Sequence, residues 1–305
     1  MYGALGVTAL FQAVLAVVGA SGPQAVQLPP LTARQKAALV VVSGVPAPHG
    51  VAGVIVQSWD PDARPRGALV FVDQEGGDVR AFASLPPSEP AAAYRTRADA
   101  YGAGRATGQA LGWARVDVDL APVLDAASGP LGSRHFRRPE LALAFARGLR
   151  AGGTAACVKH FPGLGSAQVS TDERPHVHAR VRADELAAFR AAIDAGAECV
   201  MTSHALYGRF GGRRASLAPD TYRLLRRLGF RGVAITDSLD IAGSEYAVPW
   251  ALRAVRAGAD LALFTNGRDA RRAIRALIPL ARRGRLDAHV DRVLRLRRDL
   301  GLRRP

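Results

Sequence analysis

The sequence has 305 residues but only two cysteines and only two lysines. Cys157 and Cys199 are too few for a disulfide-rich scaffold or for a cysteine-based zinc site. The chain also lacks a His-x-x-x-His pair, a Gly-x-Ser-x-Gly elbow and a glycine-rich phosphate loop. These absences weigh against metal catalysis, a serine-hydrolase site and nucleotide binding. We therefore expect neither a cofactor nor a metal ion.

The positive charge of the chain comes almost entirely from arginine. The sequence has 41 basic and 26 acidic residues, a net charge of +15, and Lys36 and Lys159 are the only lysines. Such a skew, together with 32 glycines and 19 prolines, is typical of a GC-rich coding sequence. For this reason we expect no specific nucleic-acid partner. One hypothesis for the function is nevertheless an arginine-rich surface protein that binds nucleic acid or cell-wall polymer.

The N-terminal segment contains no charged residue before Arg34. Residues Gly3–Ala20 are almost all apolar and are followed by Ser-Gly-Pro, which resembles the hydrophobic region and cleavage zone of a secretory signal. We expect residues 1–30 to be a signal peptide or a membrane anchor, with the protein exported or anchored outside the cytoplasm. A buried first helix and a cytoplasmic location are the alternatives.

From Leu31 onward, short apolar runs alternate with helical stretches. Runs that are apolar throughout are typical of parallel strands buried on both faces. About eight such units, with no linker between them, predict an α/β fold: a TIM-type (β/α)8 barrel forming a single domain over residues 31–305. We expect a monomer. The predicted strands are Leu39–Ser43, Gly53–Gln57, Ala68–Asp73, Val116–Leu120, Ala156–His160, Cys199–Ser203, Gly232–Thr236 and Asp260–Phe264. The predicted helices are Ala91–Leu111, Leu141–Ala151, Ala183–Ala195, Asp220–Leu228, Val248–Ala257, Asp269–Arg282 and Leu286–Asp299.

Much of the excess positive charge lies in the last two predicted helices. Residues Arg268–Pro305 contain 13 arginines and 4 aspartates, a net charge of +9. In a barrel these helices belong to the outer ring, away from the catalytic mouth. We expect this face to associate electrostatically with an anionic cell wall or membrane.

Catalytic residues of such barrels lie where strands end. A single Asp after a strand is usually a helix N-cap, but Lys159 ends an apolar strand in a chain with only two lysines. Together with Arg134 and His160 it supplies donors, and Asp73 supplies a carboxylate that can accept from two hydroxyl groups. This set predicts a sugar site. Asp237, at the end of the seventh strand, suits the nucleophile of a glycosidase.

Five segments that carry these residues occur in order along the chain. They are Val72–Gly77, Leu120–Asp125, Lys159–Gly163, Val200–His204 and Gly229–Asp237. Together they resemble glycoside hydrolase family 3, in its single-domain β-N-acetylhexosaminidase branch, from about Leu31 to the C-terminus. The resemblance implies a retaining, exo-acting hydrolase of carbohydrate, acting on β-linked N-acetylglucosamine in peptidoglycan fragments. It also implies that Asp237 is the nucleophile and that Asp73, Arg134, Lys159 and His160 bind the sugar.

The loop after the fifth strand departs from that family. Where the family has Asp-Ser-His, with His as the general acid/base, this chain reads Asp172-Glu173-Arg174. Arginine stays protonated at working pH and cannot exchange a proton. We expect Asp172, Glu173 or His176 to supply the proton instead. The alternative is a catalytically impaired, carbohydrate-binding relative that has kept the sugar pocket.

Overall fold

The computed structural model describes residues 30–57 and 67–302. Residues Thr32–Pro305 group into one compact unit, and the fold below is that of its described part. A signal peptide or membrane anchor is expected over residues 1–30. Residues 1–29 of that segment lie outside the described residues. Among the described helices, none is both long enough and apolar enough to cross a membrane.

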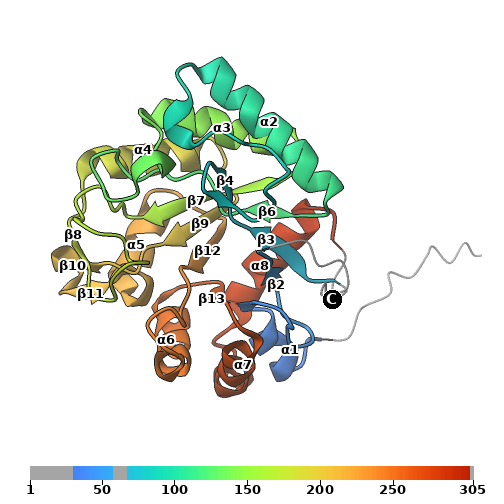
Figure 1. Cartoon of the computed structure of the whole chain (residues 1–305). Helices are drawn as coiled ribbons and strands as arrows, with labels where there is room; N and C mark the ends of the chain where they lie inside the picture. The colour runs from blue at the N-terminus through green and yellow to red at the C-terminus, as the bar shows by residue number, and fades with distance from the viewer. Residues whose placement is uncertain (1–29, 58–66, 303–305) are drawn as a thin grey trace, which may run out of the picture. The chain divides into compact units, whose positions relative to one another are not determined.

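Eight parallel strands form the barrel in the spatial order β12-β9-β7-β6-β3-β2-β1-β13 (Figure 1). A parallel bridge between Ile235 and Leu261 joins the two outer strands of that order and closes the ring. The predicted (β/α)8 barrel is confirmed, with small shifts at the strand ends. The barrel strands are β1 (Val41–Ser43), β2 (Gly53–Ile55), β3 (Leu69–Val72), β6 (Val118–Asp119), β7 (Ala155–Phe161), β9 (Cys199–Thr202), β12 (Val233–Thr236) and β13 (Ala262–Phe264).

Helices surround this barrel in Figure 1. The helix predicted over Ala91–Leu111 begins later than expected, because Thr96 caps it by accepting a hydrogen bond from the Asp99 amide. Residues 44–52, which join β1 to β2, contain no helix. The helices are α1 (Ala33–Ala38), α2 (Arg97–Trp113), α3 (Pro139–Ala151), α4 (Ala183–Asp194), α5 (Pro219–Arg227), α6 (Ser244–Ala257), α7 (Gly267–Arg282) and α8 (Asp287–Asp299).

The two cysteines meet inside the barrel. Cys157 on β7 and Cys199 on β9 are register partners, both fully buried, and they form a disulfide. Alternate residues of a strand share a face, so Lys159 and Met201 lie one layer above the disulfide, where both line the pocket described below. The disulfide thus ties two neighbouring strands directly beneath the floor of the site.

Short strands extend the segments that follow the barrel strands. After β3, the chain forms a hairpin of β4 (Gln74–Gly76) and β5 (Val79–Arg80). After β7 and β9, it forms a three-stranded sheet of β8 (His178–Ala179), β10 (Leu206–Tyr207) and β11 (Arg213–Arg214). These additions lie at the carboxyl ends of the strands, where the functional residues of barrels lie.

Candidate active site

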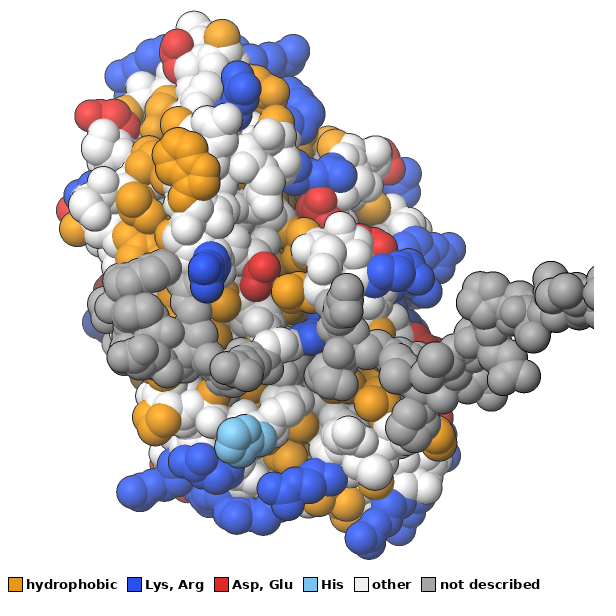
Figure 2. All heavy atoms as spheres, turned by 90° about the vertical axis from the view of Figure 1, so that its right-hand side faces the viewer, with side chains coloured by type: hydrophobic (Ala, Val, Ile, Leu, Met, Phe, Trp, Pro, Cys, Tyr) orange, Lys and Arg blue, Asp and Glu red, His pale blue; other side chains and the backbone are white. Residues whose placement is uncertain are grey.

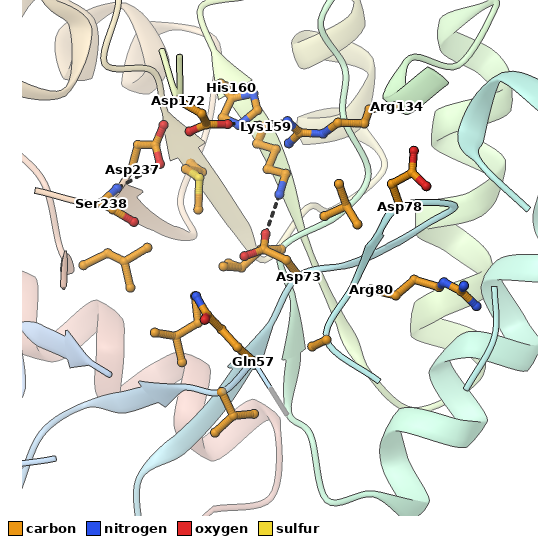
Figure 3. Close-up of a pocket in the computed structure, with 17 residues that line it drawn as sticks. Gln57, Asp73, Asp78, Arg80, Arg134, Lys159, His160, Asp172, Asp237 and Ser238 are labelled. Carbon is orange, nitrogen blue, oxygen red and sulfur yellow. Dashed lines mark hydrogen bonds and ion pairs between the residues drawn. The ribbon is translucent and has the colours of Figure 1, made fainter. Parts of the chain in front are cut away.

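A pocket of about 360 Å³ opens at the carboxyl ends of the barrel strands (Figure 3). It is lined by residues from the segments that follow several strands, as a barrel's catalytic mouth requires. Gln57, Asp78, Arg80 and Ser238 also line it. The structure brings together in this pocket six of the eight residues predicted for the site: Asp73, Arg134, Lys159, His160, Asp172 and Asp237.

Lys159 contacts two carboxylates beside the pocket. Its Nζ lies 2.6 Å from Asp73 Oδ1 and 2.6 Å from Glu75 Oε1, and its side chain is 3% exposed. Burial by itself would lower the pKa of Lys159, but Asp73 and Glu75 reverse the effect and raise it. The ammonium group is therefore permanently charged and points toward Asp73, as Figure 3 shows.

Glu75 joins Lys159 to Arg134. The Arg134 guanidinium donates two hydrogen bonds to the Glu75 carboxylate, each 2.8 Å long, a bidentate geometry that fixes its orientation. Burial alone would raise the pKa of Glu75, but Lys159 and Arg134 lower it to about 2. Glu75 was not predicted as a site residue. Its only sequence signal was its place two residues after Asp73.

His160 is oriented by Asp125, which comes from the segment after β6. The Asp125 Oδ2 atom lies 2.7 Å from His160 Nδ1, and Oδ1 accepts from the Leu164 amide at 2.9 Å. A carboxylate only accepts hydrogen bonds, so the proton of a neutral His160 ring lies on Nδ1. This leaves Nε2 as the ring nitrogen that can contact a ligand.

Asp237 is half-buried and ionised. Burial would raise its pKa, whereas His204, His160, the Ser238 amide and Lys159 together lower it; the Ser238 amide donates to Oδ1 at 2.8 Å. Figure 3 shows the carboxylate directed into the pocket. The carboxylate therefore provides an anionic oxygen at the wall of the pocket.

His204 supports the loop that carries Asp237. It is a buried histidine, with Nδ1 2.6 Å from Ser216 Oγ and Nε2 2.8 Å from the Ser238 carbonyl oxygen. Burial lowers the pKa of His204 despite the nearby carboxylate of Asp237. Through its contacts with Ser216 and Ser238, the ring fixes the backbone next to Asp237.

Of the three candidates for the proton donor, the structure brings only Asp172 into the pocket. Its Oδ2 lies 3.6 Å from Arg134 Nη1, and its amide donates to Ser170 Oγ at 3.1 Å. Glu173 and His176 are exposed and do not line this pocket. His176 and Arg174 line a separate groove on the same loop.

The pocket thus combines an ionised carboxylate, a second carboxyl group and a set of fixed donors and acceptors. Two carboxyl groups flanking a sugar-binding pocket are what glycoside hydrolysis requires. In the described part of the chain, no group of three or more His, Cys, Asp or Glu side chains is arranged to hold a metal ion.

Comparison with known proteins points the same way. The model of the "Glycosyl hydrolase family 3 N terminal domain" matches residues 58–296. A β-hexosaminidase of Stenotrophomonas maltophilia (strain R551-3) is 35% identical over 230 residues, which cover 66% of this chain and 68% of that protein. A β-hexosaminidase of Methylococcus capsulatus is 36% identical over 245 residues, covering 70% of each.

Solved structures also resemble this chain. A β-N-acetylhexosaminidase from Beutenbergia cavernae superposes with a TM-score of 0.78 at 26% identity, covering 90% of this chain and 99% of that one. A glycoside hydrolase family 3 β-N-acetylglucosaminidase from Paenibacillus superposes with a TM-score of 0.79 at 26% identity over 89% of this chain. The chain spans 63% of that second protein, less than two thirds of its length.

Proposed function

Because the chain belongs to glycosyl hydrolase family 3, we propose that it is a retaining, exo-acting enzyme that releases terminal β-linked N-acetylhexosamine. Family membership makes it a glycoside hydrolase, an enzyme that hydrolyses O-glycosyl bonds. The choice of sugar rests on relatives named β-hexosaminidase. The observation that carries the proposal is the single pocket in which Asp237 and Asp172 face four side chains able to bind hydroxyl groups.

The two carboxyl groups have different roles in the reaction. Asp237 attacks the anomeric carbon while Asp172 donates its proton to the glycosidic oxygen, so that the leaving alcohol departs and a glycosyl ester forms on Asp237. Asp172, now a carboxylate, takes a proton from water as the water oxygen attacks the anomeric carbon and frees Asp237. Two displacements at one carbon retain its configuration.

The remaining residues hold the sugar. Asp73 accepts from two adjacent hydroxyl groups, and Lys159 and Arg134 donate to sugar oxygens from positions fixed by Glu75. His160 contributes Nε2 at the pocket wall. Because these groups are already held by one another, little side-chain entropy is lost when substrate binds.

The alternative of a catalytically impaired relative is not favoured. That alternative arose because the family's acid/base His is replaced by Arg174, but Asp172 places a carboxyl group in the pocket. The relatives that match this chain at about 35% identity are named β-hexosaminidases.

Aryl glycosides test the assignment of Asp237 and Asp172. We expect wild type to hydrolyse 4-nitrophenyl β-N-acetylglucosaminide, and Asp237→Ala to lower kcat on the order of 10⁴-fold, as removal of a nucleophile does. Asp172→Asn should lower kcat/KM about 10²-fold or more on phenyl glycosides but little on dinitrophenyl glycosides, whose leaving group needs no proton. Glu173→Gln, an exposed neighbour outside the pocket, is the matched control. No hydrolysis by wild type across a panel of aryl glycosides would contradict the proposal.

We also propose that the enzyme acts outside the cytoplasm on cell-wall fragments. The apolar run Gly3–Ala20 and the disulfide between Cys157 and Cys199 support this, since disulfides persist mainly in oxidising compartments. Fractionation of cells that express the full chain is the direct test. Recovery in the cytoplasm alone would count against export.

A further inference from the structure

Glu185, in the first turn of α4, joins two loops that carry site residues. Its side chain is fully buried, and Oε1 accepts hydrogen bonds from the Ala126 amide at 3.0 Å and from the Gly165 amide at 2.7 Å. Ala126 belongs to the segment after β6, and Gly165 belongs to the segment after β7. One carboxylate oxygen therefore holds the backbones of two separate loops.

The chain closes tightly around this carboxylate. A Cβ atom added to Gly163 would lie 2.3 Å from Glu185 Cδ, and one added to Gly165 would lie 2.7 Å from Glu185 Oε1. No side chain larger than hydrogen fits at either position without displacing Glu185. The turn of the Lys-His-Phe-Pro-Gly segment is thus shaped to receive the carboxylate.

Both loops lead directly to groups of the site. Asp125, which orients His160, immediately precedes Ala126. On the other loop, Gly165 precedes Ser166, whose Oγ accepts from the Arg180 amide at 2.6 Å and closes the base of the segment that carries Asp172. Displacement of the Gly165 backbone would therefore move the base of the Asp172 loop.

We propose that Glu185 is a positioning residue that holds the Asp172 loop against the His160–Asp125 pair, so that Asp172 reaches the glycosidic oxygen. This rests on the proposed function, in which Asp172 is the acid/base. Glu185 does not line the sugar pocket, so its effect on the reaction passes through the two loop backbones.

Glu198 offers a matched control. Like Glu185, it is a largely buried glutamate whose Oε2 atom has no hydrogen-bond partner among the described residues, and it forms an ion pair with Arg150 at 2.6 Å. It precedes β9, at the opposite end of the barrel from the pocket. A change at Glu198 should affect stability without affecting the Asp172 loop.

The experiment compares phenyl and 2,4-dinitrophenyl β-N-acetylglucosaminides as substrates of the full chain. We expect Glu185→Ala to lower the ratio of kcat/KM for the phenyl to the dinitrophenyl substrate about 10-fold or more, because only the phenyl leaving group needs a proton. Glu185→Gln, which keeps an acceptor oxygen, should leave the ratio within about 3-fold of wild type. Glu198→Ala should leave the ratio unchanged even where it lowers Tm.

A second variant covers the case in which Glu185→Ala does not fold. Gly165→Ala places a methyl group between Glu185 and Ala126 and should lower the same ratio while the carboxylate remains. The role of Glu185 would be overturned if the ratio is unchanged in whichever of these variants folds. The proposed function would still stand in that case, provided that wild type is active and that the loss in Asp172→Asn depends on the leaving group. Hydrolysis of neither substrate by wild type would instead overturn the proposed function.

Discussion

Glu75 holds the two cations that face the sugar pocket. Its carboxylate contacts Lys159 at 2.6 Å and Arg134 at 2.8 Å. If Glu75 were lost, the buried Lys159 and the half-buried Arg134 would lack their shared anion, and Arg134 would lose the bidentate contact that sets its direction. Glu75, which does not line the pocket, thus determines where Lys159 and Arg134 direct their hydrogen-bond donors.

The lowered pKa of Glu75 makes stability depend on pH. Its pKa is about 2 in the folded state against 4.5 ordinarily, so its ionised form stabilises the fold above pH 4.5, and that contribution is lost as the pH falls toward 2. We expect the free energy of unfolding of wild type to fall by about 3 kcal/mol more than that of Glu75→Gln over this window. Urea unfolding at a series of pH values measures it.

Glu185→Gln tests the same link between ionisation and stability, with the opposite dependence on pH. Burial raises the pKa of Glu185 to about 7, although the amides of Ala126 and Gly165 act in the opposite direction. Below about pH 7 the fold therefore holds Glu185 protonated more firmly than the unfolded chain does, and the associated stability is lost as the pH rises from 4.5 through about 7. Equal pH dependence of both variants and wild type would contradict the assigned ionisation states.

At the scale of elements, the apolar runs determined most of what the sequence could predict. Each of the eight predicted strands is present because a run that is apolar throughout can be buried on both faces. The strands β8, β10 and β11 were not predicted, since two residues are too few to show a period. The start of α2 was misplaced because alanines at 91–93 continue the helical composition on the other side of the Thr96 cap.

The same limit applies to the site. Lys159 and His160 lie near the end of a strand and Asp237 follows one, so these three could be predicted from the chain alone. Glu75 and Glu185 could not be assigned roles, because their partners Arg134 and Gly165 lie 59 and 20 residues away. Only the folded barrel brings these groups within hydrogen-bond distance.

The disulfide links the neighbouring strands β7 and β9 covalently. Cys157 and Cys199 are 42 residues apart, and a cross-link of that span stabilises a fold by about 4 kcal/mol in the chain-entropy account. We expect the double variant Cys157→Ala, Cys199→Ala to lower the free energy of unfolding by an amount of this order. Thermal unfolding of both proteins measures it.

Thiol titration provides the control for the disulfide. Denatured wild type without reductant should expose no free thiol if Cys157 and Cys199 are paired. Two titratable thiols per chain would show that the cysteines are reduced in the isolated protein, and the stability difference would then reflect packing alone.

At the scale of the whole molecule, the charge is unevenly distributed. Four exposed arginines of α7, at positions 268, 271, 275 and 282, are spaced so that they share one outer stripe of the helix. The only acidic residue of α7, Asp269, is buried and bonded to Arg272 at 3.0 Å. Figure 2 shows Lys and Arg side chains along the lower edge of its face, the edge at which α1 and α7 lie in Figure 1.

The association expected with an anionic cell wall can be tested by neutralising the arginines of this stripe. We expect the triple variant Arg268→Gln, Arg275→Gln, Arg282→Gln to bind isolated cell walls on the order of 100-fold more weakly in about 0.1 M salt. Surface electrostatics supply about 1 kcal/mol per charge at an anionic surface, or about 3 kcal/mol for the three charges removed. Hydrolysis of a soluble aryl glycoside should be unchanged, since none of these side chains lines the pocket. Cosedimentation with walls at rising salt measures the binding.

A variant with the same loss of charge elsewhere separates the stripe from net charge. Arg95, Arg97 and Arg105 are exposed at and before α2, which lies across the barrel from α7 in Figure 1. If binding depends on the α7 stripe, replacing these three by Gln should weaken it far less, because Coulomb forces beyond about 10 Å are screened in 0.1 M salt. Equal weakening by both triple variants would show that the chain's net charge of +15, rather than the α7 surface, governs association with the wall.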